Sequence, residues 1–359
     1  MTEIGIKNQD YSVGLCFTGI TRQRAAEALA DFFGTAAEHL GGTYDTWMVM
    51  DAAERTWKLT YDPLVSGEWK IGNVPTVYKA SSLADVDSAD RAEVTAAVEG
   101  SFYPGRITAK DLNYLTTRDH AYRTRLESPM LSYGEMDQIA DCMGRIQGAG
   151  AKVNSSCEMS VHVDASNHNR QSLKNLVGIM YSKEDILFRA LQVDEHRAEV
   201  YSKKVREPLV QQMRKLSCDE TKDMTELEAI WYDGTSRPDQ PLNKTCRYAL
   251  NLHSAFFRNT VEWRCFNATF QPERAAAYVN LCLAMSAQAI TQRSTVLKKT
   301  ASENEQFTFR TFLVRLGLNG DEFKETRDLL LENLEGNKAW LRPKTPEGGR
   351  KKKKREAVR

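Results

Sequence analysis

The hydrophobic positions of this chain alternate between two spacings, one typical of strands and one typical of helices. Residues 11–19, YSVGLCFTG, alternate apolar with small or polar residues, whereas residues 21–34, TRQRAAEALADFFG, place apolar side chains at helical intervals. The first segment predicts a strand and the second a helix that ends at Gly34. Arg22 and Arg24 fall in the first turn of that helix, where cations do not favour the helix dipole, so both are expected on the solvated surface.

The same two spacings predict most of the other elements. Strands are expected within residues 45–51, 55–62, 125–131, 151–165, 247–254 and 260–269. Helices are expected within residues 132–148, 170–206, 224–234, 272–292, 307–317 and 321–337. Ser132 and Glu135 form the signature of a capping box, and Ser182 is expected to begin the second of two or three helices in 170–206. Strands separated by long helices, with antiparallel pairs near both ends, predict an α+β domain whose antiparallel or mixed sheet is covered by helices mainly on one face.

The domain organisation is less regular at two places. Residues 64–121 mix short strand-like pieces with a polar stretch, so an inserted subdomain or flap is expected there within a domain spanning 10–340. Residues 344–359 carry eight Lys or Arg against two Glu, a net charge of +6, which leaves −5 for the rest of a chain whose total is +1. Such a segment is typical of a flexible, solvated basic tail.

Composition excludes several classes of protein. With 41% hydrophobic residues the 359-residue chain can bury a sizeable core, and it contains no run of 18 apolar residues and no apolar stretch after a basic start. Its seven cysteines form no CxxC pair, and their odd number argues against a closed disulfide framework. These features predict a soluble cytoplasmic protein with reduced thiols and no membrane partner.

Polar residues recur at every second position of the predicted strand around residue 160. Successive strand side chains point to opposite faces. One face therefore carries Glu158, Ser160, His162 and Asp164, and the other carries Met159, Val161 and Val163. A histidine beside two carboxylates can bind a metal or phosphate, although a single buried histidine is more often a satisfied core residue.

Two further strands add chemistry of the same kind. The segment 260–269 places Glu262, Arg264 and Phe266 on one face, opposite Val261, Trp263 and Cys265, and the segment 247–254 contributes Arg247, Asn251 and His253. Glu262 and Arg264 are either a structural ion pair or a functional pair, in which Arg264 receives a phosphate or carboxylate and Glu262 binds a cation or an amine.

Several long segments share their residues and order with a known family. They are FTGITRQRAAEALADFFGT, SPML, GAGAKVNSSCEMSVHVDAS, SKEDILFRALQV, RYALNLHS, TVEWRCFNAT and FRTFLVRLGLNGDEFKETRDLLLENLEGNKAW. Between Tyr11 and about Trp340 the chain resembles the putative amidoligase family, carboxylate–amine ligases with a glutamine synthetase-like fold. The resemblance implies an ATP-dependent ligase in which sheet carboxylates hold Mg²⁺ against the nucleotide phosphates, since Mg²⁺ prefers hard oxygen ligands.

The chain departs from the family pattern where the resemblance implies the metal. Two carboxylates are implied at positions occupied by Gly14 and Cys16, a third at Arg125, and a histidine at Ser160. Glu158 stands where a glycine is implied. The positions that match the family pattern are Asp62, His162, Asp164, Arg247, Asn251, His253, Glu262, Arg264 and Asn267.

Three functions follow from this inventory. The favoured hypothesis is a catalytically impaired member that has lost Mg·ATP chemistry and needs no cofactor. It would bind a nucleotide or small anion at Arg247 and Arg264, or a protein or nucleic-acid partner through the insertion and the basic tail. The second is an active ligase that uses ATP and Mg²⁺. There Glu262, Arg264 and His162 would be catalytic, the metal ligands would be relocated, and the nucleotide would lie against the remaining matches. The metal ligands of the rebuilt site would be Asp62, Glu127 and Glu158, and the nucleotide contacts would be Arg247, Asn251, His253 and Asn267. The third is a nucleic-acid-binding protein that uses the basic tail.

Overall fold

The computed structural model describes residues 4–67, 69–71, 74–76, 118–217, 224–234 and 243–338. The basic tail lies outside these ranges, and so does most of the predicted insertion at 64–121. Within that insertion the described parts include β5 (Trp69–Ile71) and β6 (Val74–Thr76), which pair antiparallel as a separate two-stranded sheet.

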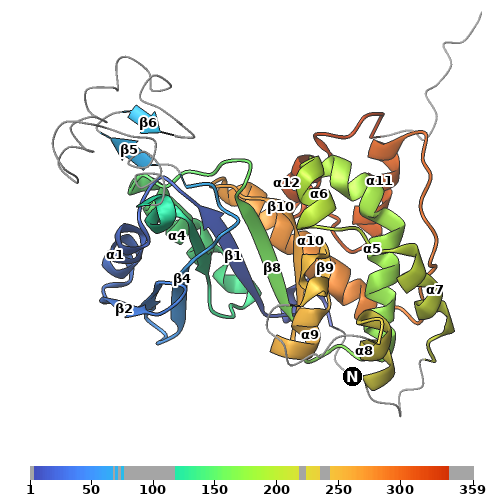
Figure 1. The fold of residues 1–359 in the computed structure, drawn as a ribbon. Coiled ribbons are helices and arrows are strands. Elements are labelled where there is room, and N and C mark those ends of the chain that lie inside the picture. The colour runs from blue at the N-terminus through green and yellow to red at the C-terminus, as the bar shows by residue number, and fades with distance from the viewer. Residues whose placement is uncertain are drawn as a thin grey trace, which may run out of the picture.

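An eight-stranded antiparallel sheet forms the centre of the described chain (Figure 1). Its strand order is β2-β3-β4-β7-β1-β8-β10-β9, so the first strand of the chain lies in the interior of the sheet. The strands are β1 (Tyr11–Phe17), β2 (Ala37–Gly41), β3 (Thr46–Met50), β4 (Thr56–Tyr61), β7 (Thr124–Glu127), β8 (Glu158–Asp164), β9 (Leu250–Asn251) and β10 (Thr260–Asn267).

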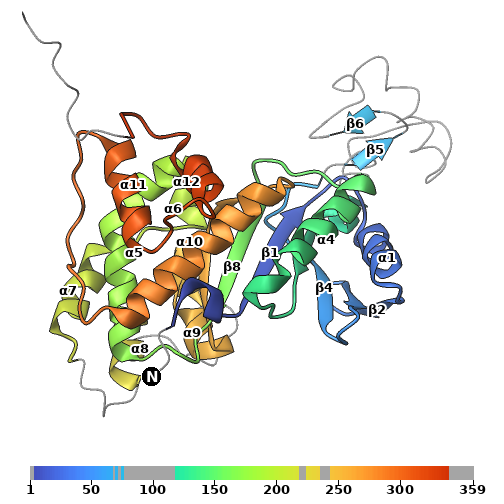
Figure 2. The same cartoon turned by 180° about the vertical axis from the view of Figure 1, so that it is seen from behind.

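Helices cover one face of this sheet. In Figure 2 α4 and α10 lie in front of β1 and β8, whereas the opposite view in Figure 1 shows these two strands without a helix in front of them. α5 packs on α10, and α1 packs on β3. The helices are α1 (Arg22–Phe33), α4 (Met136–Gly148), α5 (Arg170–Ala190), α6 (Glu195–Val200), α7 (Glu207–Lys215), α8 (Thr225–Trp231), α9 (His253–Arg258), α10 (Pro272–Thr291), α11 (Glu305–Arg315) and α12 (Lys324–Leu331). The predicted α+β class, with helices mainly on one face, is confirmed.

The alternation predicted for β8 is also confirmed. Met159, Val161 and Val163 are buried in the main core, on the helix-covered face. Glu158, Ser160 and His162 share the other face and are buried as well, although no helix in Figure 1 lies over β8 there. Buried polar groups need partners, and the partners of these three define the candidate site below.

A β-bulge in β10 corrects one part of the predicted pattern. The register with β8 shifts between Trp263 and Phe266, so Phe266 turns to the core and stacks on Tyr278 of α10 instead of sharing the polar face. The extra residue changes the phase of the strand. Beyond the bulge, Asn267 stands opposite Glu158.

The segment 247–254 is mostly not a strand. β9 contains only Leu250 and Asn251, Arg247 ends a short 3-10 helix (Lys244–Arg247), and His253 begins α9. The strand prediction, in which Asn251 and His253 share one face, is therefore wrong. The Asn251 side chain accepts a hydrogen bond from the backbone nitrogen of His253 at 2.9 Å, and the chain turns into α9 there.

Two smaller predictions are wrong. Ser182 begins no helix, because α5 continues through it and its hydroxyl instead contacts Thr300 at 2.9 Å. Arg22 is only 1% exposed rather than solvated. Its guanidinium donates to the carbonyls of His120 and Arg123 and pairs with Asp45. These acceptors compensate the buried charge.

The described cysteines are all free thiols, as predicted, with Cys218 outside the described ranges. Within those ranges, no helix combines the length and the apolar character that crossing a membrane requires.

Candidate functional site

Three central strands bring the polar face together. Gly14 of β1 stands between Glu127 of β7 on one side and Ser160 of β8 on the other. Two residues further along β1, Cys16 stands opposite Arg125. The four positions at which the family resemblance implies other residues (Gly14, Cys16, Arg125 and Ser160) therefore form one contiguous group.

The Arg125 guanidinium is the centre of this group. Nη2 donates to Ser160 Oγ at 2.7 Å, and Nε donates to Glu127 Oε1 at 3.1 Å. Nη1 lies 3.3 Å from Glu158 Oε1, and Nη2 lies 3.9 Å from Glu262 Oε1. Arg125 thus bridges the carboxylates of three strands.

Gly14 provides the space that the guanidinium occupies. A Cβ atom at this position would lie 2.6 Å from Ser160 Oγ and 2.8 Å from Arg125 Cζ, closer than real contacts allow, and Arg125 Nη2 would be nearer still. No residue larger than glycine fits at position 14 unless Arg125 or Ser160 moves. Gly14, Arg125 and Ser160 are therefore a mutually dependent set.

Cys16 connects this set to Asp62. The thiol of Cys16 donates to Asp62 Oδ2 at 3.4 Å, and Arg125 Nη1 lies 3.8 Å from the Cys16 sulfur. Burial raises the pKa of the Cys16 thiol, and the Asp62 carboxylate raises it further. Cys16 therefore stays a neutral thiol at physiological pH.

Glu158 is held by three arginines. Arg264 Nη2 donates to Glu158 Oε1 at 2.7 Å, Arg125 Nη1 approaches the same oxygen at 3.3 Å, and Arg197 Nη2 lies 3.5 Å from Oε2. The side chain of Glu158 is only about one-twentieth exposed. A carboxylate buried to this extent needs such compensation, because an unpaired buried charge is strongly destabilising.

Glu262 completes the network on the β10 side. Its Oε2 accepts from Asn251 Nδ2 at 2.6 Å, and its Oε1 lies 3.4 Å from His162 Nε2 and 3.7 Å from Arg264 Nε. His162 Nδ1 in turn lies 3.2 Å from Thr260 Oγ1. We call the six charged residues Arg125, Arg197, Arg264, Glu127, Glu158 and Glu262 the ionic network.

The network keeps its carboxylates ionised. Burial raises the pKa of Glu158, but Arg264, Arg125 and Arg197 outweigh this effect and hold the pKa below its ordinary value. Burial likewise raises the pKa of Glu262, and His162 and Arg264 outweigh it. Burial lowers the pKa of Arg264, whereas Glu158 and Glu262 raise it to a value above that of a free guanidinium. The three Arg and three Glu therefore balance to zero net charge.

These residues do not fit a magnesium ion. Each carboxylate of the network already accepts from, or pairs with, a guanidinium group, and Asp62 is bound to Cys16 and to the backbone nitrogen of Leu64. Across the described ranges, no three or more His, Cys, Asp and Glu side chains are grouped to hold a metal. The predicted metal residues Asp62, Glu127 and Glu158 are thus near one another but oriented toward Arg125 or Cys16.

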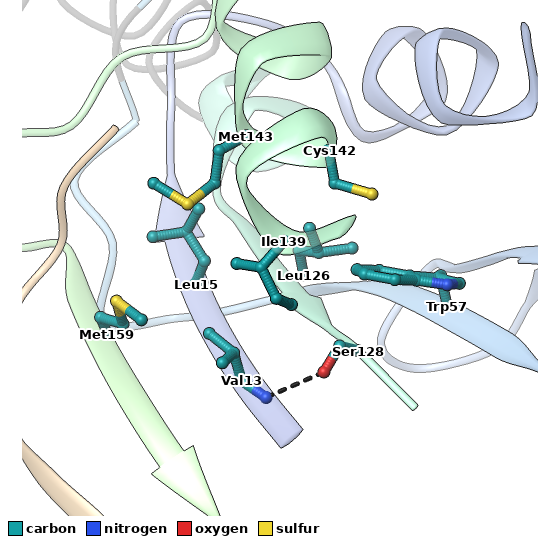
Figure 3. A pocket seen from close by; sticks show the side chains of 9 residues that line it. All are labelled: Val13, Leu15, Trp57, Leu126, Ser128, Ile139, Cys142, Met143 and Met159. Carbon is teal, nitrogen blue, oxygen red and sulfur yellow. Dashed lines mark hydrogen bonds between the residues drawn. The ribbon is translucent and has the colours of Figure 1, made fainter. Parts of the chain in front are cut away.

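A cavity of about 10 Å³ lies on the opposite, apolar face (Figure 3). α4 contributes Ile139 and Met143, which lie toward Leu15 and Val13 of β1, and Cys142, whose side chain lies on the side of Trp57. This volume is close to the minimum for one water molecule, and its lining is apolar apart from Ser128, which accepts from the Val13 backbone. It is a packing defect in the core rather than a nucleotide site.

Two of the predicted binding residues lie apart from the network. Arg247 is exposed at the end of its 3-10 helix. His253 is buried against α8, where its Nδ1 contacts the Tyr232 hydroxyl at 2.6 Å. In contrast, Asn251 and Asn267 each contact a member of the network, Glu262 and Arg197 respectively.

Arg197 was not predicted as a site residue. It comes from α6, far along the chain from its partners, and its Nη1 donates to Asn267 Oδ1 at 2.8 Å. The strand pattern that identified the other residues does not extend to a short helix. The position of Arg197 depends on how α6 packs beside β10, which the sequence spacing does not show.

A model of the family described as putative amidoligase enzyme matches residues 7–286. This range contains every strand of the central sheet and every member of the ionic network. A comparison with curated proteins found no match.

Proposed function

The chain belongs to the putative amidoligase family, and we propose that within it this protein has lost Mg·ATP-dependent ligation and acts as a metal-independent binding protein. The polar face of the sheet is retained in this proposal, but an ionic network replaces the arrangement that would hold a metal and a nucleotide. Its ligand would be a nucleotide or small anion at Arg247, which is exposed, because the guanidinium groups of the network are already paired with carboxylates.

One observation carries the proposal: the Arg125 guanidinium occupies the space that a side chain at position 14 would fill. The family resemblance implies carboxylates at positions 14, 16 and 125, which together would offer a divalent cation three negative charges. Here the three positions offer a hydrogen atom, a neutral thiol and a positive charge. Gly14 and Arg125 depend on each other sterically, so restoring a carboxylate at position 14 alone would not rebuild the site.

Electrostatics points in the same direction. A Mg²⁺ ion about 6 Å from the Arg125 guanidinium would experience a repulsion on the order of 5 kcal/mol at an effective dielectric constant of 20. A carboxylate could offset this repulsion, but Glu127, Glu158 and Glu262 already neutralise the three arginines of the network. Recruiting them to a metal would leave the buried guanidinium groups unpaired, which is costly.

Calorimetric titration with ATP, in the presence and absence of Mg²⁺, tests this proposal. We expect no Mg²⁺-dependent binding of ATP and no release of phosphate above that of buffer. The two variants Glu262→Gln, within the network, and Glu199→Gln, on an exposed position of α6, should both equal the wild type in turnover. Mg²⁺-dependent binding together with turnover that Glu262→Gln abolishes and Glu199→Gln retains would instead show an active ligase.

A further inference from the structure

The surroundings of Glu158 resemble those of a bound ligand more than those of an ordinary ion pair. Three guanidinium groups converge on its two carboxylate oxygens, and they come from three separate elements, β7, α6 and β10. Glu158 itself is 4% exposed. Convergent arginines in a dry environment are the usual recognition geometry for carboxylate and phosphate groups.

Each of the three arginines has an anchor that does not involve Glu158. Arg125 is held by Glu127 and Ser160. Arg197 donates to Asn267 Oδ1 at 2.8 Å and to the Phe266 carbonyl at 3.2 Å, while Arg264 donates to the Cys246 carbonyl at 2.7 Å. The three guanidinium groups are therefore positioned independently of the carboxylate that they surround, which is the preorganisation expected of a binding site.

Charge defines what would replace Glu158. With Glu158 the ionic network is neutral, and without it the remaining two carboxylates leave a net charge of +1. A monoanion would restore neutrality, whereas a cation would add to the excess. The vacated site would thus select a carboxylate or a singly charged phosphate.

We propose that Glu158 occupies, as a tethered internal ligand, a three-arginine site for a monoanionic carboxylate or phosphate. The inference rests on the proposed function in so far as the polar face holds no metal. In the wild-type protein the Glu158 side chain closes this site, and an external anion enters only when that side chain is absent or displaced.

The inference is tested by shortening the Glu158 side chain and adding a small anion that replaces the atoms removed. Glu158→Ala removes the atoms of a CH₂–COO⁻ group, for which acetate is the matching molecule, and Glu158→Gly removes one carbon more, for which propionate matches. The measurement is the midpoint of thermal unfolding as acetate, propionate or inorganic phosphate is added, at an ionic strength held constant with sodium chloride. We expect each variant to have a lowered midpoint that rises by roughly 3 °C for each tenfold excess of anion over its dissociation constant, while the wild type does not respond.

Two control variants separate an anion site from a general charge effect. Glu158→Gln leaves the same net charge of +1 but still fills the space, so it should be destabilised and not respond to acetate. Glu127→Ala also removes one negative charge beside Arg125, but from a side chain that is 34% exposed, and it should respond weakly or not at all. If the two Glu158 truncations do not fold alone, folding induced by the matching anion becomes the readout.

The outcomes are decisive in both directions. A response of Glu158→Ala to acetate that exceeds the responses of Glu158→Gln and the wild type at least tenfold in apparent affinity supports the site. A phosphate response in addition extends its ligands to phosphates, and its absence limits them to carboxylates. Equal responses in all variants, or no folding at any anion concentration, would overturn the inference. Neither result depends on ATP turnover, so failure here is distinct from failure of the proposed function.

Discussion

The two faces of the same strands are built by different means. On the helix-covered face Val13, Leu15, Leu126 and Met159 pack beneath α4 and α10 and require of one another only shape and volume. On the polar face each side chain has named partners at fixed distances, as with Arg125, whose guanidinium contacts side chains of three strands. A change on the apolar face is therefore felt through volume, whereas a change on the polar face is felt through charge and hydrogen bonding.

This difference explains how the fold is kept although residues of the polar face differ from those that the family resemblance implies. Nonpolar packing is non-directional and roughly proportional to the area buried, so the apolar core can keep its packing when residues of the other face are exchanged as a compensated set. The ionic network only has to leave no charge uncompensated. Gly14, Arg125 and Ser160 meet that requirement together, in the part of the sheet where the family resemblance implies a metal.

The largest expected effect comes from removing the centre of the network. Arg125→Met should destabilise the protein by about 3–5 kcal/mol at pH 7.5, because it leaves the three carboxylates of the network with two guanidinium groups and therefore one buried negative charge uncompensated. Leu15→Ala, on the apolar face of the neighbouring strand, should cost a comparable 3 kcal/mol or so. Urea unfolding at pH 7.5 and pH 4.5 distinguishes the two: the deficit of Arg125→Met should shrink at the lower pH, where the carboxylates can be protonated, and the deficit of Leu15→Ala should not. A cost below about 1 kcal/mol for Arg125→Met would mean that the network is not a closed ionic core.

The sequence predicted one face of the sheet better than the other. Alternation in β8 correctly assigned Met159, Val161 and Val163 to the core, because a strand with one apolar face has a single favourable orientation. The same alternation placed Glu158 and His162 on the polar face. It could not show that Arg125 would reach Glu158, since this contact depends on β1 lying between β7 and β8.

The predictions were wrong where local backbone geometry departed from the regular spacing of a strand or helix. The bulge at Trp263–Phe266 reversed the orientation of Phe266, and the turn at Asn251 moved His253 into a helix. Arg22 was expected at the surface from its position in the first helical turn, but three backbone and side-chain acceptors from distant segments buried it. Such acceptors come from parts of the chain that sequence spacing does not connect. The roles of the candidate site residues stay predictions.

A buried histidine in the helical layer, His168, gives a second way to compare the two faces, through the pH dependence of stability. His168 is buried between two hydroxyl groups, Ser172 Oγ at 3.0 Å and Ser286 Oγ at 2.9 Å, and burial lowers its pKa to about 4, although Asp164 acts in the opposite direction. Since the unfolded chain has a histidine pKa of about 6.5, the neutral form stabilises the fold above pH 6.5. This stability should be lost as the pH falls from 6.5 to 4, by about 2–3 kcal/mol between pH 7.5 and pH 4.5.

The stability contributed by the polar face should change with pH over a lower pH range than that contributed by His168. The pKa values of Glu158 and Glu262 are held below their ordinary values, so their contribution is present above about pH 4.5 and is lost only below it. In the His168→Gln variant, urea unfolding measured as a function of pH should not show the loss of stability between pH 6.5 and 4.5 that His168 causes in the wild type. His196→Gln, at an exposed position of α6, should keep it. An unchanged pH profile in His168→Gln would assign the loss to another group.

The smallest effect tests the tightest contact of the polar face. Gly14→Ala adds a single methyl group, which would lie 2.6 Å from Ser160 Oγ and 2.8 Å from Arg125 Cζ, so we expect a destabilisation of about 1–3 kcal/mol in urea unfolding. Gly144→Ala in α4 adds the same group with no atom within 4 Å, and should instead stabilise by about 0.4–1 kcal/mol. Because the clash involves Arg125, the cost of Gly14→Ala should fall in an Arg125→Met background, giving a coupling of at least about 0.5 kcal/mol. Strict additivity of the two substitutions would show that Gly14 and Arg125 do not constrain each other, and the substituted positions would then have changed independently.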